Sequence, residues 1–170
     1  MRRLRYNAAV SLDGYIARPD GTFDWIIHDP LFDFGALFAQ FDTLLMGRKT
    51  YEVLRAESPG GPTDRMKKYV ISRVLKQEDA PGVVIVHHDV IATVSTLKLE
   101  PGKDIWLYGG GVLFRHLLDA HLVDTVELAV MPVLLSDGIP FLSPGRSSPV
   151  MKLEHQEVFP SGIVMLRYAL

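Results

Sequence analysis

The spacing of apolar residues divides the chain into short strands that alternate with helices. The compact apolar runs that predict buried strands cover residues 4–10, 43–46, 68–71, 83–86 and 104–108. Apolar residues recur at helical intervals between Leu31 and Phe41, and helical patterns also cover 49–55, 89–99 and the segment after the glycines near 110. Apolar and polar residues then alternate over 125–130, and extended segments near 150–158 and 163–168 follow.

Strand–helix alternation that ends in antiparallel strands predicts an α/β fold, with a mixed, mostly parallel central sheet and helices on both faces. At 170 residues and without a linker-like tract, the chain is expected to form a single domain over 1–170. The proline- and glycine-rich residues 56–65 are expected to form a loop. Ligands of such sheets bind at the carboxyl ends of the strands, so the residues after each strand are the first candidates for a site.

Composition excludes several classes of function. The formal charge of −2 argues against a nucleic-acid partner, and Arg2, Arg3 and Arg5 are expected to lie on a solvated strand edge. The absence of cysteine excludes disulfides, thiolate catalysis and zinc–thiolate sites. The histidines do not form a metal site by their spacing, and no stretch reaches the roughly 20 apolar residues of a membrane span. A cytoplasmic protein with no metal and no membrane partner is expected.

The most informative segment is Trp106–Phe114, where a buried strand meets three glycines and then a helical pattern. Gly109, Gly110 and Gly111 remove every side chain at the point where the strand ends and the helix begins. Bare backbone N–H groups and the positive end of a helix dipole suit a phosphate or pyrophosphate. A tight turn without a ligand would have the same sequence.

Two further strand ends carry residues compatible with phosphate. Gly47 closes an apolar run, and the Arg-Lys-Thr residues 48–50 begin a helical pattern. They supply N–H groups, positive charge and a hydroxyl, although a capped, basic helix start in solvent is the alternative. Ser72 and Arg73 follow the next strand, where a hydroxyl and a guanidinium suit a 2′-phosphate; a polar strand end is the alternative.

Together these motifs resemble the dihydrofolate-reductase-like superfamily, and within it the C-terminal reductase domain of the bifunctional riboflavin-biosynthesis deaminase–reductase. The segments that carry the resemblance are Ser11–Ala17, Asp24–Trp25, Met46–Glu52, Ile71–Arg73, Gly109–Gly111 and Val130–Phe141. The resemblance implies a dihydrofolate reductase-like three-layer fold and an NADPH-dependent oxidoreductase that transfers hydride to a small heterocyclic substrate, as 5-amino-6-(5-phosphoribosylamino)uracil reductase does. A dihydrofolate or pterin reductase, or a non-catalytic nucleotide-binding protein of the same fold, is the alternative.

The resemblance also implies roles for individual residues. The implied cofactor residues are Ala9 and Ile16 beside the nicotinamide, Gly47, Arg48, Lys49 and Thr50 at the phosphates, Ser72 and Arg73 at the 2′-phosphate, and Gly109, Gly110, Gly111, Val112 and Leu113 at the pyrophosphate and nicotinamide end. A cis peptide is implied between the first two of the three glycines. Because family members are commonly homodimers, a homodimer is expected.

On the substrate side, Asp13 and Asp24 are the candidate proton donors, and Trp25 and Tyr51 are candidate substrate-binding residues. Asp13 before Gly14 could instead be a turn residue, Asp24 could cap a short turn, and Trp25 could belong to the core. Hydride transfer needs no protein nucleophile or metal, only held reactants and the exclusion of water.

Two departures from the family concern the substrate. The acid that protonates the pterin in dihydrofolate reductases falls on Leu31 here, with Asp29 and Asp33 on either side. The acid usual before the paired glycines of riboflavin-pathway reductases is replaced by Tyr108. The motifs therefore support the reductase scaffold but leave its substrate open. The phenylalanines at 32, 34, 38 and 41 are expected to be core and helix-packing residues.

Overall fold

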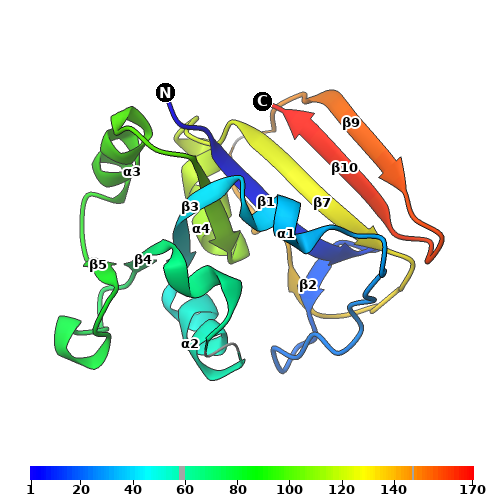
Figure 1. Ribbon diagram of the computed structural model, residues 1–170, viewed down its shortest axis with the longest axis horizontal. Coiled ribbons are helices and arrows are strands. Elements are labelled where there is room, and N and C mark those ends of the chain that lie inside the picture. Colours follow the sequence, from blue (N-terminus) through cyan, green and yellow to red (C-terminus); the bar gives the residue numbers. More distant parts are fainter. Residues whose placement is uncertain (58–59, 147) are drawn as a thin grey trace.

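The computed structural model describes residues 1–57, 60–146 and 148–170. Its centre is an eight-stranded sheet in the order β5-β4-β3-β6-β1-β7-β10-β9, with helices on both faces (Figure 1). The six strands from β5 to β7 in this order are parallel, β10 pairs antiparallel with β7, and β9 pairs antiparallel with β10. The predicted fold class is thereby confirmed.

The order of strands and helices along the chain is close to the predicted one. The strands of the large sheet are β1 (Leu4–Ser11), β3 (Phe41–Gly47), β4 (Lys67–Ile71), β5 (Val84–Val86), β6 (Asp104–Gly109), β7 (Thr125–Met131), β9 (Lys152–Val158) and β10 (Val164–Ala169). A two-stranded sheet pairs β2 (Tyr15–Ala17) with β8 (Ile139–Pro140). The helices are α1 (Phe34–Phe38), α2 (Arg48–Glu57), α3 (Val90–Leu99) and α4 (Gly111–Asp119), with 3₁₀ turns at Pro62–Arg65 and Gln77–Asp79.

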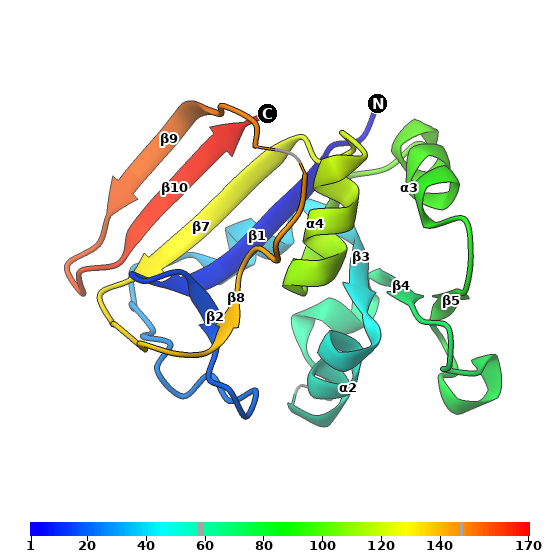
Figure 2. The same cartoon turned by 180° about the vertical axis from the view of Figure 1, so that it is seen from behind.

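Alternating side chains of the buried strands build a separate core on each face of the sheet. Leu44 and Met46 pack on one face with Trp106 and residues of α1 and α2, whereas Leu45 and Leu107 pack on the opposite face with residues of α3 and α4. Figures 1 and 2 show these two helical layers from the front and from behind. Because successive strand residues point to opposite faces, continuous apolar runs are required for strands covered on both sides.

Helix α1 is far shorter than the helix expected from the apolar spacing. The Asp33 carboxylate caps it by accepting a hydrogen bond from a first-turn N–H at 2.8 Å, and the helix ends at Phe38. Phe41 already belongs to β3. The recurrent phenylalanines reflect packing across the sheet, since the ring centroids of Phe38 and Trp106 lie 5.7 Å apart.

The expectation of a solvated arginine edge is wrong for two of its three members. Arg5 is 1% exposed, pairs with Glu127 and lies 4.6 Å above the centre of the Phe41 ring. Arg2 is also buried and pairs with Asp42. For Arg5 the physical reason is the place of β1, which lies inside the sheet between β6 and β7 rather than at an edge. Arg2 lies before β1 and donates to Asp42, Thr43 and the Lys103 carbonyl.

Two local expectations need smaller corrections. Helix α2 extends into the segment expected as a loop, reaching Glu57, and a 3₁₀ turn covers Pro62–Arg65; residues 58–59 lie outside the described residues. The helix expected over 89–99 is α3, which begins at Val90; Asp89 is its N-cap residue, but the Asp89 side chain makes no capping hydrogen bond.

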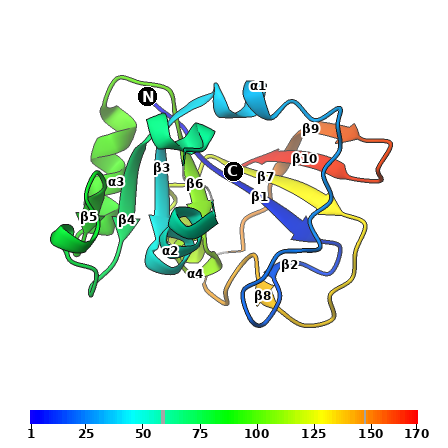
Figure 3. The same cartoon turned by 60° about the horizontal axis from the view of Figure 1, so that its bottom comes forward.

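The parallel strands all end at the same edge of the sheet, which Figure 3 turns toward the viewer. From β3 the chain continues outward to β4 and β5, and β6 then returns between β3 and β1. This reversal of strand order creates the crevice in which open α/β sheets bind their ligands. Gly47 at the end of β3 and Gly109 at the end of β6 both lie beside it.

Candidate active site

A cleft of about 2370 Å³ begins at the carboxyl ends of the strands and continues across the α1-covered face of the sheet. This is more than twice the roughly 1,000 Å³ of a large single-ligand pocket, so a dinucleotide and a second small molecule have room together. The residues expected to bind the cofactor all line this cleft, namely Ala9, Ile16, Gly47, Arg48, Lys49, Thr50, Ser72, Arg73, Gly109, Gly110, Gly111, Val112 and Leu113.

The turn from β6 to α4 presents bare backbone to the cleft. The Gly109–Gly110 peptide is cis, as the resemblance implied, and Gly109 has a φ of 139° that L side chains rarely adopt. Helix α4 begins at once, and the Gly110 carbonyl accepts the Phe114 N–H at 3.0 Å. The N–H groups of the first turn, which have no partner within the helix, are thus available to an anion at the positive end of the helix dipole.

The turn from β3 to α2 meets the glycine turn from the other side. A Cβ placed on Gly47 would meet no atom within 4 Å. A Cβ placed on either Gly109 or Gly110 would lie 3.7 Å from the Thr50 hydroxyl oxygen. Two motifs separated by about sixty residues therefore face each other, with the Thr50 side chain beside the glycine turn and the N-termini of α2 and α4 close to both.

The next strand ends place polar residues farther along the cleft. Ser72 is buried, and its hydroxyl oxygen accepts the N–H groups of Val74 and Leu75 at 3.2 and 2.9 Å. Arg73 is exposed along the same wall. Arg48 pairs with Glu52 at 2.6 Å, so an anion in the cleft would compete with that carboxylate.

Sequence reasoning did not assign His87 and His88 to a site, although both line the cleft beside the predicted 2′-phosphate residues. They follow β5, and their ring centroids lie 6.3 Å apart. The Ser72 N–H donates to the Val86 carbonyl at 3.1 Å, which ties the ends of β4 and β5 together. In the sequence, the only signal that could have found His87 and His88 was their position directly after a predicted strand.

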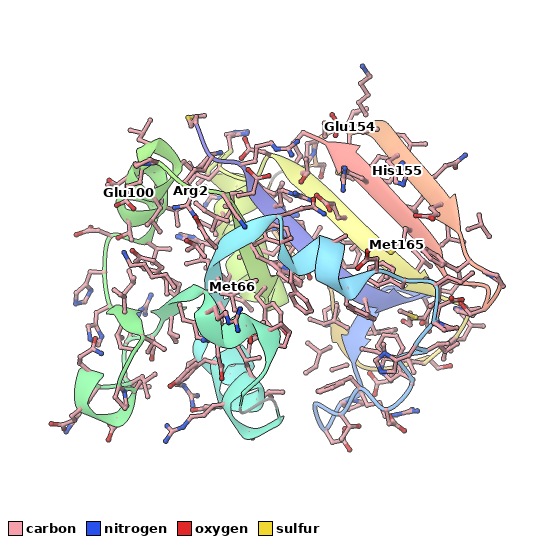
Figure 4. All side chains as sticks on the ribbon, viewed as in Figure 1. Arg2, Met66, Glu100, Glu154, His155 and Met165 are labelled. Carbon is pink, nitrogen blue, oxygen red and sulfur yellow. The ribbon has the colours of Figure 1, made fainter. Side chains whose placement is uncertain are left out.

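The part of the cleft on the α1-covered face, called here the α1-side half, is apolar and aromatic. Its apolar lining includes Ile27, Phe32, Phe34, Phe38, Trp106, Ala129, Met131 and Met165. Met165, labelled in Figure 4, is contributed by β10. Phe32, Phe34 and Phe38 face the cleft rather than lying wholly in the core, because α1 is too short to cover this region. Planar ligands suit such walls.

Polar groups that line the α1-side half include Asn7, His28 and Asp29. Asp29 is 5% exposed and accepts the N–H groups of Leu31 at 2.8 Å and Ser161 at 3.1 Å. Hydrogen bonding to Ser161, followed by that to Leu31, lowers the pKa of Asp29 below its ordinary value. Asp29 is therefore ionised at neutral pH and acts as a hydrogen-bond acceptor.

The two candidate proton donors do not line the cleft. The Asp13 carboxylate accepts the Ser11 hydroxyl at 2.6 Å and the N–H groups of Leu135 and Ser136. These hydrogen bonds, led by that from Ser11, lower the pKa of Asp13, which makes it a clamp for the loop after β7. Asp24 is exposed and pairs with Arg18 at 2.7 Å.

The two candidate substrate residues also lie outside the cleft lining. Trp25 is 7% exposed and packs with Met131, Phe159 and Ile163, as the core alternative predicted. Tyr51 is buried among the residues that α2 packs against the sheet. The structure thus brings the predicted cofactor residues together but places Asp29, rather than the predicted aspartates, beside the α1-side half.

Within the described ranges, no group of three or more histidine or acidic residues is placed to hold a metal ion. In the same part of the chain, no helix has both the length and the apolar composition needed to cross a bilayer. At the strand ends the cleft offers backbone N–H groups, hydroxyls and cations, which fit a phosphorylated organic cofactor.

A mostly parallel sheet covered on both faces, with a glycine- and cation-lined cleft at its carboxyl edge, defines an α/β protein of the dihydrofolate reductase-like class. The sequence profile of the RibD C-terminal domain matches residues 2–165, and the chain belongs to this family. The chain is 34% identical to the uncharacterized protein YyaP of Bacillus subtilis (strain 168), across 98% of this chain and 94% of YyaP.

Two solved structures extend the comparison. A protein of Shewanella sp. PV-4, assigned provisionally to riboflavin biosynthesis, superposes with a TM-score of 0.85 and 26% identity, covering 98% of each chain. Dihydrofolate reductase of Enterococcus faecalis, solved with NADP(H), superposes with a TM-score of 0.71 and 19% identity, covering 98% of this chain and 95% of the reductase. The second likeness concerns the fold alone.

Proposed function

We propose that this protein is an NADPH-dependent reductase of a small planar heterocycle. The observation that carries the proposal is the convergence of two helix N-termini, two glycine turns and the Ser72–Arg73 pair on one cleft. Such a cleft offers N–H groups and dipoles to a pyrophosphate and a guanidinium with a hydroxyl to a 2′-phosphate. A neighbour of the same fold, the E. faecalis reductase, was solved with NADP(H).

Different residues would hold different parts of the cofactor. The N–H groups of Gly110 to Leu113 and the Thr50 hydroxyl would hold the pyrophosphate, while Ser72 and Arg73 would hold the adenosine phosphate. Ala9 and Ile16 would wall the nicotinamide where the cofactor part of the cleft meets the α1-side half. When bound, NADPH supplies a hydride, and the protein contributes orientation, exclusion of water and a proton.

The α1-side half would hold the hydride acceptor. Its aromatic walls suit a flat ring, and the ionised Asp29 suits an N–H group on the edge of that ring. Reduction of a C=N bond adds a hydride to carbon and a proton to nitrogen. His28, exposed at the rim of this half, and water at the cleft mouth are the proton sources that the arrangement offers.

The distribution of charge bears on the substrate class. Among the described lining residues, the lysine and arginine side chains are Arg48, Lys49 and Arg73, and they follow β3 and β4 on the cofactor side. Among these described residues, the α1-side half therefore has no lysine or arginine to bind the phosphate of a phosphoribosyl group. This favours an unphosphorylated, pterin-like heterocycle as the substrate over a phosphoribosylaminouracil.

Fluorescence titration of the purified protein with NADPH and NADH tests the proposal. We expect NADPH to bind at least about tenfold more tightly, equivalent to about 1.4 kcal/mol, because Arg73 and Ser72 suit the additional phosphate. Equal affinity, or no binding of either, would contradict the proposal. Oxidation of bound NADPH by dihydrofolate, compared with oxidation by the phosphoribosylaminouracil, then separates the two substrate classes. Binding without oxidation by any of a broad panel of heterocycles would indicate a nucleotide-binding protein instead.

A further inference from the structure

Asn7 lies on the floor of the α1-side half and has no role in the function proposed above. Arg5, Asn7 and Ala9 project from β1 to the α1-covered face, and Asn7 is only 8% exposed. Ala9, predicted to wall the nicotinamide, lies two residues farther along the strand. Two strand residues span about 6.6 Å, so Asn7 lies roughly one ring's width deeper in the cleft.

The strand partner of Asn7 is Glu127 on β7, a carboxylate that is 2% exposed. Burial by itself raises the pKa of Glu127, but hydrogen bonds and charge from Arg5, with help from Arg167 and Thr125, outweigh it and lower the pKa below the ordinary value. The Arg5 guanidinium donates to both carboxylate oxygens, at 2.6 and 2.8 Å. Glu127 is therefore ionised and can only accept hydrogen bonds.

This buried carboxylate determines which way the Asn7 amide points. The Asn7 Nδ2 group donates to Glu127 at 3.3 Å, and a flipped amide would place two acceptor oxygens against each other. The backbone carbonyl of Asn7 already accepts the Trp106 indole N–H at 3.0 Å. The amide oxygen of Asn7 accepts no hydrogen bond from the described residues and belongs to a side chain that lines the cleft.

We propose that Asn7 is a specificity-determining residue, whose amide oxygen accepts a hydrogen bond from an N–H group of the ring bound in the α1-side half. The inference rests on the proposed reductase function. Asn7 and Asp29 together present two acceptors to this half, one on the sheet and one on the segment before α1. Glu127 is the positioning residue, because it holds the Asn7 amide in the accepting orientation.

Isothermal titration of the NADPH-saturated protein with two probes tests the inference. The probes are 2,4-diaminopyrimidine, which presents N–H groups, and 2,4-dimethoxypyrimidine, which has the same ring without them. We expect wild-type protein to prefer the diamino probe. The Asn7→Leu variant, which keeps the side-chain shape but removes the acceptor, should weaken diamino binding about five- to tenfold and leave dimethoxy binding unchanged or stronger.

Two further variants make the result specific. In Glu127→Gln, the new side-chain amide can donate to the Asn7 oxygen, which allows the Asn7 amide to flip. The ratio of diamino to dimethoxy affinity should therefore decrease. Met165→Leu is the matched control: it alters the same cleft without removing a hydrogen-bonding group, and should change the binding of both probes alike. If Glu127→Gln does not fold, Asn7→Leu and the control still decide the question.

The inference is overturned if wild-type protein binds neither probe or shows no preference, or if Asn7→Leu affects both probes equally. Failure of the proposed function has a different readout, since it appears in the affinity for NADPH compared with NADH and in NADPH oxidation, not in the preference between the two probes. Unchanged NADPH affinity in Asn7→Leu, measured first, keeps the two outcomes distinguishable.

Discussion

Asp13, Asp24 and Asp29 show how much the surroundings of a carboxylate decide its role. All three precede the first helix, yet of the three only Asp29 lines the cleft. Asp13 is occupied by backbone N–H groups of the loop after β7, and Asp24 by Arg18. A residue that already accepts several hydrogen bonds is a poor proton donor, because those bonds stabilise its ionised form.

At the same scale, Arg73 is the residue that should distinguish NADPH from NADH. We expect Arg73→Ala to weaken NADPH binding about tenfold and to leave NADH binding nearly unchanged, because a charge-assisted contact with the 2′-phosphate is lost. Fluorescence titration of both cofactors measures the ratio. Arg65→Ala, an exposed arginine outside the cleft lining, is the control. An equal loss for both cofactors would place Arg73 elsewhere on the nucleotide.

At the scale of elements, Gly110 and Gly111 at the start of α4 are glycines for different physical reasons. A Cβ on Gly111 would lie 2.7 Å from the Pro140 carbonyl oxygen, so this glycine allows β8 to pack against the helix. A Cβ on Gly110 would make only an ordinary 3.7 Å contact with Thr50, and it would stand in the cleft. Gly111 thus serves the fold, whereas Gly110 leaves space for a ligand.

This difference predicts opposite outcomes for two neighbouring substitutions. Gly111→Ala should destabilise the protein by about 1–3 kcal/mol, because backbone atoms must move apart. That corresponds to a lowering of Tm by several degrees in thermal unfolding. Gly110→Ala should leave Tm nearly unchanged but weaken NADPH binding about tenfold or more. Reversed effects would contradict the assignment of these two glycines.

At the scale of the whole molecule, a buried ionic network connects the first strand to strands from the second half of the chain. Arg5 contacts Glu127 and Asp104, at 2.6 and 3.2 Å, and Arg167 approaches the same Glu127 at 3.4 Å. For both carboxylates, burial alone raises the pKa, but hydrogen bonds and charge from arginine outweigh it and leave the pKa lowered.

The network predicts a loss of stability in acid. Carboxylates whose folded pKa is lowered bind protons more readily in the unfolded chain, so their stabilisation is full above the unfolded pKa of about 4 and falls as pH decreases through the lower folded values. Urea unfolding should show this decline below about pH 4.5. Glu127→Gln should be less stable at pH 7, because Arg5 loses its main partner, and its decline in acid should be shallower. A parallel decline in the variant would exclude Glu127 as a contributor.

The sequence was most informative where structure is local. Buried strands, the glycine turns after β3 and β6 and the cations that follow β3 and β4 were all predicted, and the structure confirms the fold and places these residues on one cleft. Turn chemistry and strand periodicity depend on neighbouring residues, so they can be recognised in order along the chain. The homodimer stays a prediction.

Only tertiary structure decided which polar groups face the cleft. Arg5 and Glu127 are 122 positions apart, and Asp29 and Ser161 are 132 positions apart, so no local pattern signals either pair. Their positions depend on β1 lying inside the sheet and on the short α1 leaving part of the sheet face open. Local sequence determined the strand ends and their phosphate-compatible residues. Long-range packing determined the burial of Arg5, the orientation of the Asn7 amide and which of the three aspartates, Asp29, lines the cleft. The reason is that burial and hydrogen-bond partners are properties of the assembled sheet rather than of any single segment.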